Sequence, residues 1–356
     1  MSPDTWDILV PTAPLSRAPA GLLSPRAFAP FFLLAFFSSG CRDKASPDEA
    51  KEKAQKKQSA QKPARLYLPR EATHDAPRDV PEAELAAADG VTFGPQGSGV
   101  LEAGSSHLCP PEMVFVGARF CIDRFEANLV DSKSGRALSP HYPPSKHYST
   151  SLFERWSRKA PKSGRELGRN LAVPPPPTFQ LEQDFSPRAR SVLGAVPAAY
   201  LNRPLASDAC TNAGKRLCRR DEWTQACRGE SNTKFPYGNK YQAGLCNVHR
   251  QSHPARLVHG DASMHHLDPR LGLTADDDGP LLQNTGTSSQ CASRWGNDAV
   301  YDMVGNVDEW IDDPGGAFLG GFFSRGTKEG CDASIDVHSP GYLDYSLGVR
   351  CCSDPT

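Results

Sequence analysis

Two kinds of side chain in this sequence can bind metals or form covalent bonds, namely cysteine and histidine. The chain of 356 residues contains 11 cysteines and 10 histidines. Five of the histidines fall in one short segment: His249, His253, His259, His265 and His266. Two interpretations stay open for this group, a transition-metal site or a set of solvated side chains. We favour solvated side chains, because the spacing follows no helix face.

The meaning of the cysteines depends on the compartment, and the N-terminal sequence favours export. Arg17 and Arg26 precede an apolar run at residues 27–37. The run is too short to span a bilayer and is typical of a signal peptide. Ser-Ser-Gly and then Cys41 follow the run, and this resembles a bacterial lipoprotein site. We therefore predict a signal segment over residues 1–41 with lipidation at Cys41, and secretion without a lipid is the alternative.

In an exported chain, cysteines predict a disulfide framework rather than metal or redox chemistry. Ten cysteines remain when Cys41 is set aside, and an even number permits complete pairing. They are Cys109, Cys121, Cys210, Cys218, Cys227, Cys246, Cys291, Cys331, Cys351 and Cys352.

Composition divides the chain into three parts. Residues 42–105 are rich in Lys, Ala, Glu, Gln and Pro and have no apolar face to bury, so we predict a disordered tether. Residues 106–356 are predicted to form the folded domain. Within it, residues at about 130–200 form a Pro-rich insert for which we predict neither a helix nor an inner strand. The insert is either a mobile excursion or a partner-binding loop.

Local patterns predict few regular elements in the domain. A turn at Gly117 is expected to join two short strands. Ser207 or Asp208 is expected to cap one helix and Asp221 a second. The 32 prolines and 30 glycines indicate a loop-rich fold, and a net charge of −1 favours neither nucleic acid nor an acidic membrane surface as a partner.

Five pieces of the sequence, taken in order, carry a resemblance to a known family. They are residues 113–126, residues 210–229, Phe-Pro-Tyr-Gly-Asn at 235–239, YDMVGNVDEW at 301–310, and Gly320-Gly321 followed by residues 347–351. Together they resemble the formylglycine-generating enzyme family, also called the sulfatase-modifying factor family. The resemblance covers about residues 109–353. It implies an α+β fold, the irregular C-type-lectin-like fold of this family, which is loop-rich and here stapled by disulfides.

The resemblance also implies two of the disulfides, Cys210–Cys351 and Cys227–Cys331. For the other six cysteines, proximity and parity alone predict Cys109–Cys121, Cys246–Cys291 and Cys218–Cys352. A bridge that closes a long loop stabilises a chain by about 3–5 kcal/mol. Such bridges explain how a loop-rich chain holds together.

The enzymes of the family bind copper through two cysteines in the loop after Gly-Gly and oxidise a substrate cysteine to formylglycine. Carried over by position from Gly320-Gly321, the first cysteine falls at Arg325 and the second near Gly330, one residue from Cys331. An arginine cannot ligate copper, because its guanidinium stays protonated. The sequence therefore predicts that the catalytic cysteine pair is missing, with Cys331 as a weak candidate for one remaining ligand.

The resemblance further implies structural calcium at two places. At the signature, Asp302 and Glu309 would supply carboxylates, and Gly305 and Val307 carbonyl oxygens; such hard oxygen ligands suit calcium. The second place corresponds to Asn247 and the carbonyl of Val248, with an acidic partner expected among residues 276–278. The alternative is that Asp302 and Glu309 only hydrogen-bond the turn. Asp308 stands where the family usually has tryptophan.

These observations favour an exported, lipid-anchored cell-envelope protein whose domain binds a peptide or protein ligand, or serves as a scaffold, without catalysis. It would face the periplasm or the cell surface, with the membrane as a partner through the lipid. The alternative is a copper-dependent formylglycine-generating oxidase that acts on a sulfatase cysteine.

Overall fold

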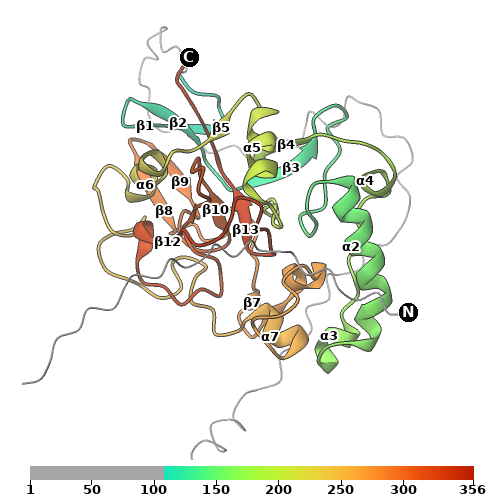
Figure 1. The fold of residues 1–356 in the computed structure, drawn as a ribbon. Helices are drawn as coiled ribbons and strands as arrows, with labels where there is room; N and C mark the ends of the chain where they lie inside the picture. Colours follow the sequence, from blue (N-terminus) through green and yellow to red (C-terminus); the bar gives the residue numbers. More distant parts are fainter. Residues whose placement is uncertain (1–107) are drawn as a thin grey trace, which may run out of the picture. The chain divides into compact units, whose positions relative to one another are not determined.

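The computed structural model describes residues 108–356, and its first sheet joins the two ends of that segment (Figure 1). Its strands run in the order β1 (Met113–Val116), β2 (Phe120–Asp123), β14 (Cys351–Ser353) and β5 (Arg216–Leu217), with every pair antiparallel. The turn between β1 and β2 has positive φ at both Gly117 and Ala118. This mirror-image turn matches the natural twist of a hairpin, and it confirms the expected turn at Gly117.

The second sheet contains the signature segment. Its order is β12 (Ser334–Ile335), β11 (Phe318–Leu319), β10 (Asp308–Trp310) and β13 (Leu347–Val349), and β10 pairs in parallel with β13. Only Arg350 separates β13 from β14 of the first sheet. The side chain of Arg350 is therefore placed at the junction of the two sheets.

The domain also contains three two-stranded sheets and several short helical segments. The pairs are β3 (Ala127–Asp131) with β4 (Pro187–Ser191), β6 (Ala275–Asp276) with β7 (Gly279–Pro280), and β8 (Ala292–Trp295) with β9 (Asp298–Tyr301). The helical segments in this part of the chain are α7 (Pro254–His259), η3 (Pro269–Leu273) and η4 (Gly330–Asp332).

Two helices lie beside the sheets, α5 (Arg203–Thr211) and α6 (Arg220–Arg228). α5 begins earlier than expected, because the side chain of Asn202 caps it by accepting a hydrogen bond from the Leu205 N–H at 2.9 Å. For α6 the expected cap at Asp221 is wrong. Glu222 instead reaches back and accepts from the Arg219 N–H at 2.9 Å.

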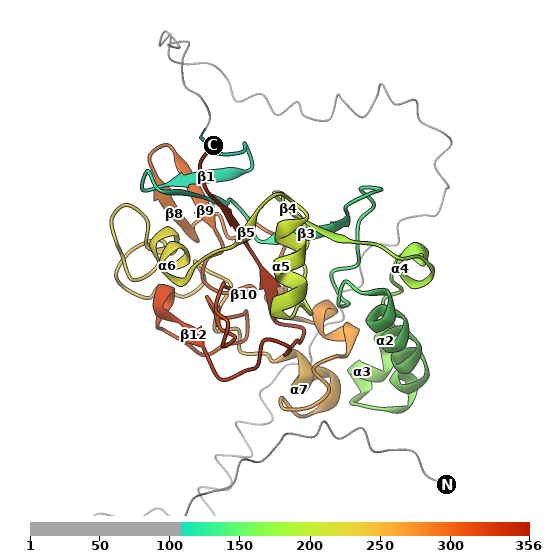
Figure 2. The ribbon, with the colours of Figure 1, turned by 45° about the horizontal axis from the view of Figure 1, so that its top comes forward.

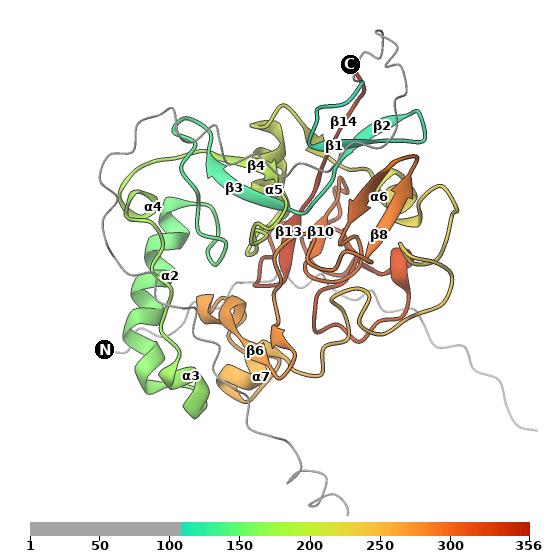
Figure 3. The same cartoon turned by 180° about the vertical axis from the view of Figure 1, so that it is seen from behind.

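The Pro-rich insert is ordered, and the prediction that it contains no helix is wrong. It leaves the domain through β3, returns through β4, and contains α2 (Lys146–Lys159), η2 (Ala160–Lys162), α3 (Glu166–Asn170) and α4 (Thr178–Glu182) (Figure 3). α2 buries Trp156 and Leu152 with Tyr142 in a small apolar cluster. This tertiary packing stabilises a helix whose own sequence gives little sign of it. Figure 2 shows the insert and α6 on opposite sides of α5.

Five disulfides run through the domain, in the pairing given above: Cys109–Cys121, Cys210–Cys351, Cys218–Cys352, Cys227–Cys331 and Cys246–Cys291. All but Cys109 are buried, and most lie within the two main apolar clusters. One cluster surrounds Trp223 and the other surrounds Trp310. The bridges therefore supply part of the core of a fold with short strands.

No helix within residues 108–356 is long and apolar enough to cross a membrane. The predicted signal segment, Cys41 and the whole of the predicted tether lie outside the described residues.

Candidate functional site

The signature segment forms a tight turn between β9 and β10. Asp302, Gly305 and Asn306 all have positive φ. Gly305 is required there, because a Cβ at this position would come within 2.3 Å of the Asn247 carbonyl oxygen. The N–H of Asn306 donates to that carbonyl at 2.8 Å, and the Asn247 amide donates to Asn306 Oδ1 at 3.0 Å. The structure thus brings the two predicted calcium places side by side.

A buried ion pair holds the signature to the last strands. Both carboxylate oxygens of Glu309 accept from Arg350, at 2.9–3.1 Å, and Trp223 Nε1 donates to Oε2 at 2.6 Å. Arg350 also donates to the carbonyl oxygens of Asp123 and Tyr301. Arg350 is fully buried and Glu309 nearly so, so each charge depends on the other for compensation.

Two further buried carboxylates lie near this pair. Glu126 accepts from Asn306 Nδ2 at 2.7 Å and from the Val307 N–H at 3.1 Å. Burial, together with the charges of Asp302 and Glu309, raises the pKa of Glu126 well above its usual range. Burial also raises the pKa of Asp302 to about 6. Glu126 was not identified as a site residue from the sequence. Its position directly before a buried strand was the available signal, because a buried charge needs a hydrogen-bonding or ionic partner.

The contacts of Glu309 do not fit the predicted calcium site at the signature. Its two oxygens are fully engaged by Arg350 and Trp223, and a guanidinium beside the carboxylate would repel a divalent ion. Asp302 Oδ2 accepts from the Gly286 N–H at 2.6 Å. In this structure, Asp302 and Glu309 therefore form hydrogen bonds with neighbouring groups, which is the alternative to calcium binding that the sequence left open.

The second predicted calcium place retains an unpaired acceptor. Asn247 Oδ1 is buried and has no hydrogen-bond partner within residues 108–356, while the amide nitrogen donates to the Leu281 carbonyl and to Asn306. An unpaired amide oxygen is the type of ligand that a hard cation takes, and calcium needs about six to eight oxygens in all. Of the three candidate acidic partners, Asp276 forms an ion pair with Arg250, whereas Asp277 and Asp278 are exposed.

The position at which the resemblance places a copper-binding cysteine contains an ion pair. Arg325 Nη2 donates to Asp308 Oδ2 at 2.6 Å, and the Gly321 N–H donates to Asp308 Oδ1 at 2.9 Å. The Asp308 side chain is fully buried, whereas that of Arg325 is 20% exposed. The Arg325 guanidinium also lies 5.7 Å from the ring centre of Phe322. Two departures from the family pattern, Asp308 and Arg325, thus bind one another.

Cys331 is not available as a thiol in this structure. It is 1% exposed, lies in η4, and is bonded to Cys227 of α6. The copper site that the resemblance implies needs two thiolates, soft ligands that suit Cu(I). A guanidinium and a disulfide do not provide them, so the residues at this position do not fit copper.

The Asp308–Arg325 pair makes stability depend on pH. Burial raises the pKa of Asp308 to about 7, although Arg325 opposes the shift. The folded state therefore holds a proton more tightly than the unfolded state, and its stability falls as pH rises through the range of about 4 to 7. We expect Asp308→Asn to reduce this loss by a few kcal/mol, on the order given by linkage. Denaturant unfolding of the disulfide-intact chain at several pH values measures it.

The exposed Asp277→Asn is the matched control for that prediction and should keep the wild-type slope. Equal slopes in Asp308→Asn and the wild type would contradict the assignment of the slope to Asp308.

Four of the five clustered histidines contact different polar partners, and the ring of the fifth, His265, packs against Trp156 and His259. His259 Nε2 contacts Asp268 at 2.8 Å, His253 Nε2 contacts the Tyr345 hydroxyl at 3.2 Å, and His266 Nε2 contacts the Ala262 carbonyl at 2.8 Å. His249 contacts the Thr327 carbonyl. Within residues 108–356, no group of three or more His, Cys, Asp or Glu side chains is placed to hold a metal ion. The His259 side chain is only 3% exposed, so the interpretation as a solvated side chain is wrong for His259.

Comparison with known proteins identifies the core of this domain. The sequence model of the family described as sulfatase-modifying factor enzyme 1-like domain matches residues 197–334. Residues 197–334 form a sulfatase-modifying factor enzyme 1-like domain. The match includes α5, α6, the signature and the loop with Arg325. With the mixed helices and strands and the five disulfides, it confirms the predicted α+β, C-type-lectin-like fold. A search of curated proteins finds no match.

Several solved structures resemble the domain at low sequence identity. The Major Tropism Determinant I1 variant has a TM-score of 0.36 and 13% identity, covering 70% of this chain and 54% of its own. CarF has a TM-score of 0.33 and 13% identity, covering 66% and 86%. PvdO from Pseudomonas aeruginosa has a TM-score of 0.33 and 14% identity, covering 66% and 80%. This chain thus spans about half the length of the tropism determinant.

Proposed function

We propose that this protein is an exported, lipid-anchored cell-envelope protein whose sulfatase-modifying-factor-type domain is a binding and scaffold module for a peptide or protein ligand. One observation carries the proposal. The Asp308–Arg325 ion pair stands where the resemblance places a copper-binding cysteine. The Asp308–Arg325 contact links the loop to β10 and has no use in copper chemistry.

The bonding state of Cys331 supports the same proposal. A second copper ligand would require Cys331 to leave its bridge with Cys227, which closes a separation of 104 residues. Five disulfides also suit a chain that folds in an oxidising compartment, as export implies. The membrane would then be reached through a lipid on Cys41, with the domain facing the periplasm or the cell surface.

The family match favours a second candidate, a copper-dependent formylglycine-generating oxidase. The two candidates differ in the thiols they require. We expect alkylation of the native, unreduced full chain, followed by peptide mapping, to leave all ten cysteines from Cys109 to Cys352 unlabelled. Labelling of Cys331 together with Cys227 would support the oxidase and would contradict the binding module.

Calcium remains a prediction for the place where an acceptor is unpaired. Held by the Asn247 side-chain oxygen and the Val248 carbonyl, the ion would supply structural cross-linking only. We expect calcium added after chelator treatment to raise the thermal midpoint of the wild type and not that of Asn247→Ala. The variant should also lose about 1–3 kcal/mol, because its contacts with Leu281 and Asn306 are removed. An equal calcium shift in both proteins would show that Asn247 holds no calcium.

A further inference from the structure

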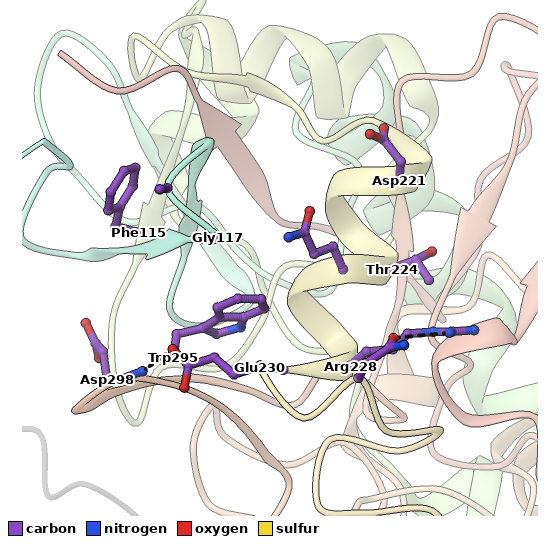
Figure 4. A pocket seen from close by; sticks show the side chains of 13 residues that line it. Phe115, Gly117, Asp221, Thr224, Arg228, Glu230, Trp295 and Asp298 are labelled. Carbon is purple, nitrogen blue, oxygen red and sulfur yellow. Dashed lines mark hydrogen bonds between the residues drawn. The ribbon is translucent and has the colours of Figure 1, made fainter.

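A cleft separate from the Asp308–Arg325 pair opens between the β1–β2 turn, α6 and the β8–β9 hairpin (Figure 4). Its volume is about 1080 Å³, which lies just above the usual range for ligand pockets. Gly117 lies on one side of Trp295 and Glu230 on the other. We infer that this cleft binds a lysine side chain of a partner peptide, with its ammonium over Trp295 and against Glu230. The inference rests on the proposed role as a peptide-binding module and names the ligand chemistry.

Trp295 offers its ring rather than its N–H to a ligand. The indole Nε1 donates to the Ala226 carbonyl of α6 at 3.2 Å, which fixes the side chain and uses its only donor. Trp295 packs against the core but is only partly buried, and it lines the cleft together with Phe115. An aromatic face with no donor to offer attracts cations through its quadrupole, and tryptophan attracts them most strongly.

The carboxylate of Glu230 is held beside this ring with one oxygen free. Oε1 accepts from the N–H of Gly296, the residue after Trp295, at 2.9 Å. Glu230 has no ion pair within residues 108–356. Its nearest basic neighbour in the cleft, Arg228, is turned toward Asp332 at 2.6 Å. One free oxygen suits a compact ammonium better than a guanidinium, which prefers both oxygens of a carboxylate.

The other charges in the cleft also disfavour an anion. Asp298 pairs with Arg124 and Asp221 with Arg119, so both are compensated. Arg228 is likewise paired with Asp332, so the carboxylate of Glu230 is the one charge of the lining that no ion pair within residues 108–356 compensates. An uncompensated negative charge in a cleft raises the local concentration of cations.

The size and the remaining polar groups indicate a peptide rather than a free amine. A single side chain would leave most of the cleft empty. Thr224 and Gln225 of α6 line the wall of the cleft. Gln225 Oε1 accepts a hydrogen bond from Arg119 at 2.9 Å, so the amide nitrogen of Gln225 is on the side away from Arg119. That amide reaches the turn only because Gly117 has no side chain, since a Cβ there would be 2.5 Å from Gln225 Nε2. A hydroxyl and an amide suit backbone groups beside the lysine.

The test is titration of the purified full chain with a fluorescent Gly-Ser-Lys-Ser-Gly peptide, compared with the same peptide acetylated on lysine. Anisotropy measures the affinity, and we expect a dissociation constant on the order of 0.1–1 mM. Acetylation, Glu230→Gln and Trp295→Leu should each weaken binding by about tenfold. Higher salt should also weaken it. Glu166→Gln, at an exposed carboxylate of α3 on the far side of the domain, is the matched control and should bind as the wild type does.

Equal binding of the lysine and acetyl-lysine peptides, or equal losses in Glu230→Gln and Glu166→Gln, would overturn the inference. Binding of neutral oligosaccharides in the cleft, with no response to the lysine peptide, would also overturn it. Thermal unfolding of Trp295→Leu and Glu230→Gln separates loss of binding from loss of fold. If the lysine peptide does not bind, the inference about lysine is wrong but the proposed function is not, because the proposed function is tested by formylglycine production.

Discussion

Replacing Arg350 with methionine should cost about 3–5 kcal/mol of unfolding free energy, since it leaves the buried carboxylate of Glu309 without its cation. Two backbone carbonyls, those of Asp123 and Tyr301, would lose their donors as well. The two sheets meet at this side chain, so we expect the whole domain to be affected. Guanidinium-induced unfolding of the disulfide-intact protein gives the difference.

Two further variants serve as controls for the Arg350→Met prediction. Arg119→Met breaks an exposed pair with Asp221 and should cost less than about 1 kcal/mol. The double variant Arg350→Met with Glu309→Gln removes both charges and should be more stable than Arg350→Met alone, because no unpaired charge remains buried. A double variant less stable than the single one would show that the loss comes from packing and not from the orphaned charge.

Loss of the Cys210–Cys351 bridge should have the second large effect. Both sulfurs are buried, and the bridge joins α5 to β14 across 141 residues. Loop-closure entropy gives about 5 kcal/mol for a loop of this length in a chain without other bridges. Because Cys218–Cys352 and Cys227–Cys331 stay in place and close most of the same span, substitution of Cys210 and Cys351 by alanine should lower stability by about 3 kcal/mol. Thermal unfolding at one scan rate measures the change.

The chain supplies a matched control for the disulfide. Cys109–Cys121 closes only 12 residues, so its removal should cost about 3 kcal/mol or less. A larger loss from Cys109–Cys121 than from Cys210–Cys351 would contradict the loop-entropy argument. It would then point to native contacts of β2, where Cys121 is buried, as the source of stability.

The resemblance predicted the fold class and two of the disulfide pairs, and proximity and parity of the remaining cysteines predicted the other three. The helix α2 was not predictable in the same way. Its stability comes from Trp156 packed against residues distant in sequence, and the surrounding prolines suggested irregular structure. A pattern that is weak locally becomes a helix when its apolar side finds a partner.

For the candidate sites, too, single residues could be recognised from the sequence, but their contacts could not. Asp308 and Arg325 are 17 residues apart and were recognised separately as departures from the family pattern. Their opposite charges were the available signal, but only the loop geometry after Gly321 shows that they meet. The cleft with Trp295 and Glu230 is assembled from three separate segments, and no single motif marks it. Distant contacts of this kind are fixed by the fold and are not visible as local spacing.

The central claim is that this sulfatase-modifying-factor-type domain binds a ligand and does not form formylglycine. The most direct measurement incubates the purified, copper-loaded full chain under oxygen with a peptide that contains the Cys-x-Pro-x-Arg motif of sulfatases. Mass spectrometry follows the substrate cysteine. The account predicts an unchanged cysteine from protein shown to be folded, with Cys227–Cys331 intact. Formylglycine in the peptide would contradict the account and would mean that Cys331 becomes a copper ligand despite its disulfide.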